Sequence, residues 1–449
     1  MDSKIKLYDL TPSQEVVKMQ LKYSIDKRVI NILSSATFAS AVNKDALTKA
    51  VNLAVKRVDS ARLRFVKVKG KLMQYFAQNV KTEVKEISFS CLKEQEKFLE
   101  RERKRPIKYL KGKSAEFWLV KTYDGKDMLF VKACHYIFDT YGLMTFYKDI
   151  FEVYESIVED KQLPSEPAKF EDVIVRELDK KNDKVLEQKR REFFEEYFSE
   201  KPQPYYAGIA GLTTKIAKKS FDKHLMKYFF LSNQTQGYIK DIDKPIADKA
   251  FEYCKQKRIS PANLMFFAAS LCQSKLNGGV KNLLQLELCN CRPTALDRNC
   301  AGTKVQSLGC YVQFDYGKSL SENLNTFCQN QNTYYRYVGF SDMEFQAMTH
   351  AIWHSSPIKT YYGLTFSYIP VVKPGGTDFM LYSNGKCALP CYFAIMHNVT
   401  DNTLKTVYDV QKKLCDQNHV DVFHKNFVSI LQQIVSDDSI LLDFIKISK

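Results

Sequence analysis

The segment that most constrains this chain sets a histidine, His135, and an aspartate, Asp139, four residues apart between two apolar stretches. The apolar run 128–131 before it is typical of a buried strand, and the stretch 143–158 after it has a helical period. We therefore expect one imidazole at the edge of a sheet. Imidazole titrates near neutrality, so it can take a proton from a hydroxyl or amine and return it. A buried, hydrogen-bonded histidine is the alternative interpretation.

Length and composition indicate a globular protein with two lobes. The chain has 449 residues, more than one hydrophobic core usually accommodates. Its residues are 45% hydrophobic and 13% aromatic, which argues against disorder. No apolar run approaches the ~20 residues that span a bilayer. No signal-peptide core follows the first residues. We therefore expect a cytoplasmic chain without a transmembrane segment.

The formal net charge of +16 is spread along the chain, with basic clusters at 101–113, 180–191 and 215–223. A solvated, lysine-rich surface is one interpretation. Attraction for an acidic partner, either a carrier protein or the phosphates of coenzyme A, is the other. No helix-turn-helix and no RNP-type strand is evident, so we expect no nucleic-acid partner.

The cysteines and histidines do not indicate a metal site. Twelve cysteines are too few for a disulfide scaffold, and most stand in apolar surroundings typical of reduced, buried thiols. Cys289–Cys291 and Cys387–Cys391 lack a second pair at zinc spacing. His350 and His354 would share a helix face, but no acidic residue stands between them as in a metalloprotease helix.

Local patterns predict alternating strands and helices. Asp124-Gly125 and Lys69-Gly70 mark hairpin turns, and the proline-containing stretch 161–169 reads as a linker. The expected elements are a strand at 29–39, a helix at 45–58, a hairpin within 63–76, a helix at 92–104, a hairpin within 116–133, a long charged helix at 171–200, strands at 365–372 and 391–398, and a closing helix at 421–435.

Five segments, in order between residues 7 and 314, carry a family resemblance. They are LYDLTPSQEVV (7–17), VDSARLRF (58–65), CHYIFDT (134–140), ISPANLMFFAASLCQSKLNG (259–278) and CNCRPTALDRNCAGTKVQSLGCYVQF (289–314). Together they resemble the condensation-domain family of nonribosomal peptide synthetases, within the chloramphenicol-acetyltransferase-like superfamily. The family signature is HHxxxDG; here its second histidine is His135 and its aspartate is Asp139.

The resemblance implies an α/β (α+β) fold of two chloramphenicol-acetyltransferase-like lobes, with mixed sheets flanked by helices, V-shaped around a central channel. Residues 1–168 would form the N-terminal lobe with the HxxxD motif, and 169–449 the C-terminal lobe. The chain has about the length of one such domain. A stand-alone member is therefore expected, for which any carrier protein acts in trans.

The resemblance also implies roles for single residues. His135 would act as general base, and Asp139 would pair with Arg292 of the Arg-Pro element and fix the loop. A buried Asp–Arg pair is costly to break from one side, by about 3–5 kcal/mol. Ser367 is similar in place to a hydroxyl that some superfamily members use for the oxyanion, and an ordinary strand serine is the alternative.

Two positions depart from the signature. Cys134 replaces the first histidine, where a packed, loop-supporting thiol is expected, with a nucleophile as the alternative. Thr140 replaces the glycine. Its branched side chain would either crowd the channel or cap the following helix. Gly142, two residues on, would restore some room.

Two functions follow. The first is a condensation-like acyltransferase that moves an acyl group from a carrier-protein (phosphopantetheinyl) or coenzyme A thioester to an amine or hydroxyl of a small-molecule acceptor, with no tightly bound cofactor and no metal. The second is a catalytically degenerate relative that binds a carrier or partner. The departures at Cys134 and Thr140 favour the second, and the retention of His135 and Asp139 favours the first.

Overall fold

Three separate stretches of the chain build the first of its two structural units. The computed structural model describes residues 5–22, 24–80, 82–211, 224–227, 233–371, 377–387 and 389–448. Unit 1 comprises Met1–Lys184, Asn290–Val305 and Val371–Lys386, and unit 2 comprises Val185–Cys289, Gln306–Pro370 and Cys387–Lys449. The single boundary expected after residue 168 thus differs from this division, because two late segments join unit 1.

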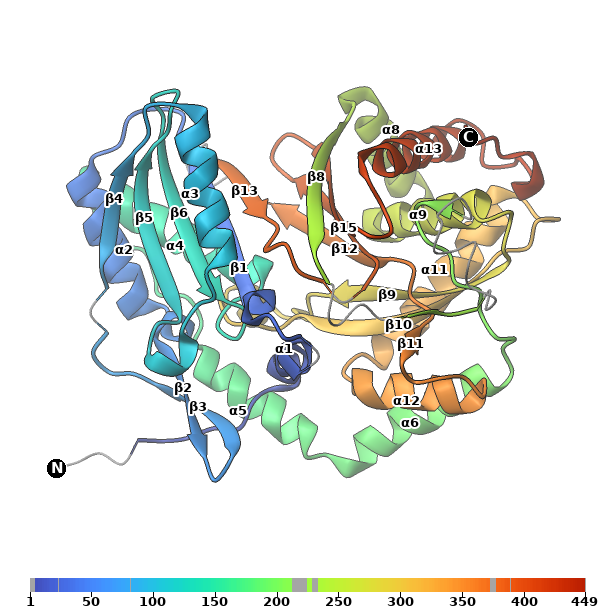
Figure 1. The fold of residues 1–449 in the computed structure, drawn as a ribbon, viewed down its shortest axis with the longest axis horizontal. Coiled ribbons are helices and arrows are strands. Elements are labelled where there is room, and N and C mark those ends of the chain that lie inside the picture. Colours follow the sequence, from blue (N-terminus) through green and yellow to red (C-terminus); the bar gives the residue numbers. More distant parts are fainter. Residues whose placement is uncertain are drawn as a thin grey trace. The chain divides into compact units, whose positions relative to one another are not determined.

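Unit 1 carries the HxxxD motif between a strand and a helix (Figure 1). Its helices and strands are α1 (Pro12–Lys22), β1 (Asn31–Thr37), α2 (Lys44–Arg57), β2 (Leu63–Val68), β3 (Lys71–Phe76), β4 (Val84–Ser88), α3 (Leu92–Lys104), β5 (Ala115–Lys121), β6 (Asp127–Cys134), α4 (Thr140–Val158), α5 (Phe170–Lys181), α10 (Ala295–Arg298) and β13 (Asp378–Tyr382).

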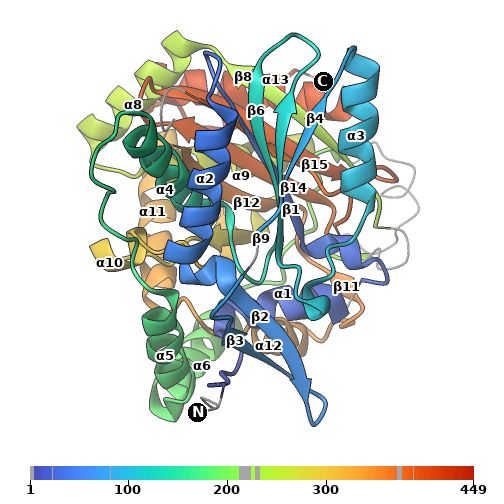
Figure 2. The same ribbon diagram turned by 90° about the vertical axis from the view of Figure 1, so that its left-hand side faces the viewer.

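A five-stranded mixed sheet of order β13-β1-β6-β5-β4 forms the centre of unit 1. β6 pairs antiparallel with β1 and β5, whereas β4 runs parallel to β5. Phe98 of α3 packs on Trp118 and Phe130 on one face. Phe146 of α4 packs on Phe117 on the other, beside α2 (Figures 1 and 2). β6 is buried along its whole length, so it is a fixed support for the motif that follows.

Unit 2 contains the remaining elements. They are α6 (Lys184–Ser199), β7 (Met226–Lys227), β8 (Thr235–Ile242), α8 (Lys244–Lys257), α9 (Pro261–Leu276), β9 (Asn282–Cys289), β10 (Gln306–Gln313), α11 (Leu320–Arg336), α12 (Asp342–Ile352), β11 (Lys359–Thr360), β12 (Thr365–Val371), β14 (Cys391–Asn398), β15 (Thr403–Gln411) and α13 (Gln417–Ser436).

The core of unit 2 lies against a six-stranded mixed sheet of order β10-β9-β12-β14-β15-β8. β9 pairs parallel with β12 and antiparallel with β10. Phe266 of the buried helix α9 stacks on Phe366 of β12 with ring centroids 4.6 Å apart. Phe427 of α13 packs on Phe393 of β14. Mixed sheets flanked by helices confirm the expected fold class.

Most local predictions are confirmed. The helix 92–104 and both hairpins form as expected, and at the first hairpin Lys69 and Gly70 both have positive φ. The long helix expected at 171–200 is wrong: α5 ends at Lys181 and α6 begins at Lys184. His350 and His354 do not share a helix face, because α12 ends at Ile352 and His354 has φ 46°.

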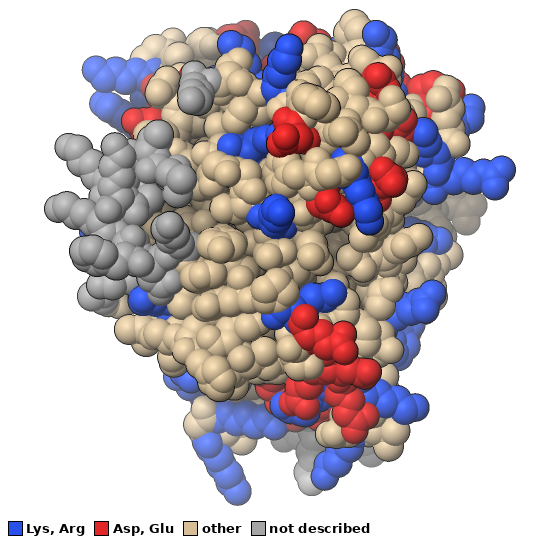
Figure 3. All heavy atoms as spheres, turned by 90° about the vertical axis from the view of Figure 1, so that its right-hand side faces the viewer, with Lys and Arg blue, Asp and Glu red and all other residues tan. Residues whose placement is uncertain are grey.

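On the face shown in Figure 3, basic side chains are scattered beside a broad uncharged area, and acidic side chains gather at its lower right. In the cluster 101–113, Arg101, Arg103 and Arg105 each pair with a glutamate. The cluster 215–223 lies outside the described residues. All twelve cysteines are free thiols. Within the described ranges, every helix is too short or too polar to cross a bilayer.

Candidate active site

His135 stands in the turn between β6 and α4. Its backbone N–H donates to the carbonyl of Ile30 over 2.9 Å, and Ile137 N–H donates to Cys134 C=O over 2.9 Å. The end of the strand is buried, and buried backbone groups require hydrogen-bond partners. These two hydrogen bonds supply the partners and so hold the chain in a tight turn. The backbone of the histidine is therefore fixed on both sides.

The imidazole itself is less constrained than its backbone. Nδ1 is buried and has no hydrogen-bond partner of standard geometry among the described residues. Burial lowers the pKa of His135 below its usual 6.5, against the smaller opposing effects of hydrogen bonds with its own main chain and with that of Phe138, and of the charge of Asp139. The ring is therefore mostly neutral at neutral pH, and a neutral ring has one nitrogen able to accept a proton.

Asp139 is fully engaged as a hydrogen-bond acceptor. It is the N-cap of α4 and accepts from the backbone of Gly142 over 2.7 Å. It also accepts from the backbone of Lys304 over 2.7 Å and of Val305 over 2.9 Å. Burial alone would raise the pKa of Asp139, but Arg292 and these amides outweigh burial and lower it. A carboxylate held ionised in this way supports structure and is poorly suited to proton transfer.

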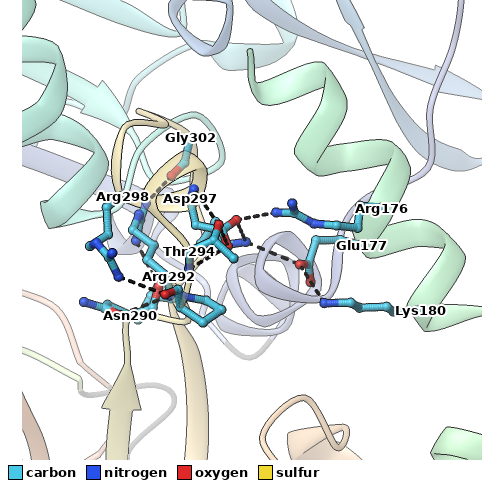
Figure 4. Close-up of polar contacts among 12 residues, drawn as sticks. Arg176, Glu177, Lys180, Asn290, Arg292, Thr294, Asp297, Arg298 and Gly302 are labelled. Atoms are coloured by element: carbon cyan, nitrogen blue, oxygen red, sulfur yellow. Dashed lines mark hydrogen bonds and ion pairs between the residues drawn. The ribbon is translucent and has the colours of Figure 1, made fainter. Parts of the chain in front are cut away.

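The expected ion pair between Asp139 and Arg292 is present. Both guanidinium Nη atoms donate to the carboxylate over 2.9 Å, and both side chains are almost fully buried. Arg292 also donates to the carbonyls of Asn290 and Gly302 (Figure 4) and lies over the ring of Tyr141 at 4.7 Å. The two-point geometry fixes the loop in orientation as well as in distance.

Gly142 and Thr140 stand in the first turn of α4. A Cβ at Gly142 would lie 2.1 Å from the carbonyl oxygen of Ala301, so only glycine allows this close approach. The room expected at Gly142 is thus occupied by the chain itself. Thr140 does not cap α4, because Asp139, one residue earlier, does so. Thr140 is the first helical residue and is partly exposed.

Cys134 and Ser367 are both buried. Burial raises the pKa of Cys134 to about 12, which keeps its thiol protonated and disfavours a nucleophile. Ser367 lies on β12 in unit 2, where its hydroxyl hydrogen-bonds the side chain of Tyr392. The oxyanion role of Ser367 stays a prediction.

Sequence reasoning singled out Arg292 but did not predict that the segment Asn290–Val305 around it, which we call the strap, joins unit 1. The strap belongs to unit 1, although β9 before it and β10 after it belong to unit 2. Figure 4 shows the strap beside α5, from which Arg176 and Glu177 project toward it. Arg176 pairs with Asp297, which also accepts from Lys304 over 2.7 Å. The spacing of Thr294 and Asp297, a capping box in the structure, was the one local signal of order here.

The described residues contain no group of three or more His, Cys, Asp or Glu side chains able to hold a metal ion. They do place His135, Asp139, Gly142 and Arg292 in one unit, linked through the strap. Such an arrangement holds one neutral imidazole on a rigid support, which is the arrangement that proton abstraction requires.

A model of the condensation-domain family matches residues 4–353. The chain belongs to the condensation-domain family. No curated protein matches it. The fold is similar to a mutant starter condensation domain of rhizomide synthetase RzmA in complex with C8-CoA (TM-score 0.82, 13% identity, covering 99% of this chain and 98% of that one). It is also similar to the condensation domain of the monacolin K polyketide synthase MokA (0.81, 13%, 98% and 99%). A third is the first condensation domain of the calcium-dependent antibiotic synthetase with a substrate analogue (0.82, 12%, 99% and 99%).

Proposed function

We propose that this protein is an acyltransferase that moves an acyl group from a thioester to an amine or hydroxyl acceptor, with His135 as general base. The observation that carries the proposal is the placement of the imidazole: it is partly exposed, it stands on a backbone fixed by the strand end, and burial lowers its pKa, so that the ring is neutral at physiological pH. Membership of the condensation-domain family supports the same chemistry.

The reaction needs little beyond alignment and a base. As the acceptor nitrogen or oxygen attacks the thioester carbonyl, the His135 ring takes the proton that this atom loses. The tetrahedral oxyanion then collapses, the C–S bond breaks, and the imidazolium returns the proton to the leaving thiolate. Positioning supplies much of the rate, since a bimolecular step becomes effectively intramolecular.

The donor is a coenzyme A thioester or an acyl group on the phosphopantetheine arm of a carrier protein supplied in trans. Similar structures were obtained with C8-CoA, and one also with Leu-SNAC. Those ligands make octanoyl-CoA and aminoacyl thioesters the first donors and acceptors to test. The net charge of +16 favours either polyanionic donor over a neutral one.

The alternative is a degenerate relative that binds a carrier without catalysis, favoured by Thr140 at the signature's glycine position. A histidine with both nitrogens bound to protein would have supported it, because such a ring cannot accept a proton. The partly exposed ring of His135 and the Asp139–Arg292 pair that holds its loop favour the enzyme.

The test measures free thiol released from octanoyl-CoA, and separately from an octanoyl carrier protein, with a panel of amines and alcohols. We expect acceptor-dependent thiol release by the wild type and its loss in His135→Ala. The control is His354→Asn, since His354 is exposed and its φ of 46° suits asparagine. Turnover by His135→Ala equal to wild type would remove His135 as the base. No turnover with any donor would favour the binding protein.

A further inference from the structure

The loop that carries His135 has a second support besides Asp139. The hydroxyl of Thr303, in the strap, donates to the backbone carbonyl of His135 over 2.7 Å. Thr303 is 1% exposed, so the hydrogen bond is shielded from competing water. It is also the one contact in which a strap side chain is bonded to the histidine residue itself, within the part of the chain that is described.

Thr303 is held in place by the residue that follows it. The backbone N–H of Lys304 donates to Asp139 over 2.7 Å. Its side chain, 4% exposed, pairs with Asp297 over 2.7 Å and with Glu177 over 3.3 Å. Lys304 therefore ties the motif aspartate, the strap and helix α5 together at one residue.

Charge and packing both favour this placement. Burial would raise the pKa of Asp297, but hydrogen bonds from Lys304 and Thr294 outweigh burial and lower it, so the carboxylate stays ionised opposite the ammonium group. Next to Thr303, a Cβ at Gly302 would lie 1.9 Å from the ring of Phe170. The strap is thus packed against the start of α5 without room for displacement.

We infer that Thr303 is a positioning residue for His135, and that Lys304 holds Thr303 in place from helix α5. This inference rests on the proposed role of His135 as base. The hydroxyl of Thr303 fixes the backbone carbonyl of His135, which lies only a few covalent bonds from the imidazole ring. Any rotation of that peptide would move the ring relative to an attacking acceptor, and small misplacements of catalytic groups are costly in rate.

The carbonyl also has an electronic link to the ring. Burial lowers the pKa of the imidazole, and a hydrogen bond between the ring and the main chain of His135 raises it by less. Asp139 is the charged group that acts on the ring. Thr303 donates to the same carbonyl oxygen. Without that donor the oxygen interacts more strongly with a protonated ring, so the pKa of His135 would rise towards 6.5.

Two variants separate the effect of the Thr303 hydroxyl from the effect of side-chain volume. Thr303→Val keeps the shape and removes the hydroxyl, whereas Thr303→Ser keeps the hydroxyl. We expect Thr303→Val to lower kcat by roughly 10²-fold with little change in KM, and Thr303→Ser to stay close to wild type. The matched control is Thr349→Val in unit 2, a 1%-exposed threonine whose hydroxyl also donates to a carbonyl, that of Phe345.

The second readout does not depend on turnover. In protein with isotope-labelled histidine rings, the His135 resonance is the one missing from His135→Ala, and its titration midpoint is measured by NMR. Thr303→Val should move this midpoint upward and Thr303→Ser should not. If Thr303→Val does not fold, Lys304→Met, which removes the ammonium group but keeps the chain length, should displace the same resonance.

A His135 resonance, midpoint and kcat unchanged in Thr303→Val would overturn the inference, as would equal losses in the Val and Ser variants. If the protein turns over no thioester but Thr303→Val still moves the His135 midpoint, the proposed function fails while the positioning role stands. The two failures are therefore distinguishable.

Discussion

Two imidazoles, the buried His397 of unit 2 and the partly exposed His135 of unit 1, show how differently the fold treats the same side chain. His397 of unit 2 bonds on both sides: its Nδ1 lies 2.7 Å from the hydroxyl of Tyr368 and its Nε2 lies 3.1 Å from Oδ1 of Asn402. Phe251 stacks on its ring at 4.4 Å. His135 of unit 1 has Nδ1 without a partner among the described residues.

Burial lowers the pKa of both rings, so protonation alone does not distinguish them. The two rings differ in the hydrogen bonds that their nitrogens make to side chains. Because Oδ1 of Asn402 only accepts, Nε2 of His397 must donate to it and Nδ1 must accept from Tyr368. Both nitrogens of that ring are bonded to side chains, whereas Nδ1 of His135 has no side-chain partner among the described residues. A lowered pKa thus marks burial in both rings, and the rings differ in how many side chains hold them.

The largest expected effect separates the two histidines by activity. His135→Ala should reduce acyl transfer by about 10²–10⁴-fold, the usual loss when a general base is removed, with an unchanged thermal midpoint. His397→Ala should leave turnover per folded molecule intact and destabilise the protein by about 1–3 kcal/mol, since two polar partners lose their bonds. Thiol release and thermal unfolding measure the pair. An equal loss of activity in both variants would contradict the different roles of the two histidines.

Next in size is the support beneath His135. Asp139→Ala and Arg292→Ala should each destabilise the protein by about 3–5 kcal/mol, because each leaves a buried charge uncompensated. The double variant should cost less than the two single losses added together. Denaturant unfolding of all four proteins measures the coupling. Strict additivity would mean that the pair does not act as a unit.

The same pair makes a pH prediction. The folded pKa of Asp139 lies below its ordinary 3.8, so its stabilisation is complete above that value and is lost as pH falls through the lowered folded pKa. The free energy of unfolding of Asp139→Asn should therefore approach that of the wild type only in strong acid. A difference that already narrows between pH 7 and 5 would contradict the assignment.

A smaller effect tests the close approach of α4 to the strap. Gly142→Ala should destabilise by about 1–3 kcal/mol through overpacking, because its Cβ meets the carbonyl of Ala301. Gly317→Ala is the control, since a Cβ there meets only Asp315 at an ordinary 3.5 Å. Equal melting temperatures for the two variants would mean that the strap yields easily.

Sequence patterns predicted what is decided locally. The helix 92–104 and the hairpin at Lys69-Gly70 follow from period, charge and turn chemistry within a few residues. The Asp139–Arg292 pair was reachable only through the family resemblance, since 153 positions separate its members. The V shape and the central channel stay predictions.

Other features were decided by long-range packing. Polar side chains continue through Asn182 and Asp183, so no local change in polarity marks the break between α5 and α6. Asp139 and Thr140 are both good caps, and the end of β6 decides which one is used. Thr303 and Lys304 look like ordinary loop residues, because the His135 carbonyl and Glu177, to which their side chains are bonded, lie more than a hundred positions away. Only the folded chain brings these groups together.

The central claim is that His135 accepts the acceptor's proton as a neutral base, and the pH dependence of kcat/KM tests it most directly. With a slow acceptor, so that proton transfer limits the rate, kcat/KM reports the pKa of the free enzyme's base. We expect a single-proton acid limb with its midpoint below 6.5, and we expect this limb to be absent from the residual activity of His135→Ala. A midpoint at or above 6.5, or a limb that persists in His135→Ala while the fold remains intact, would contradict it.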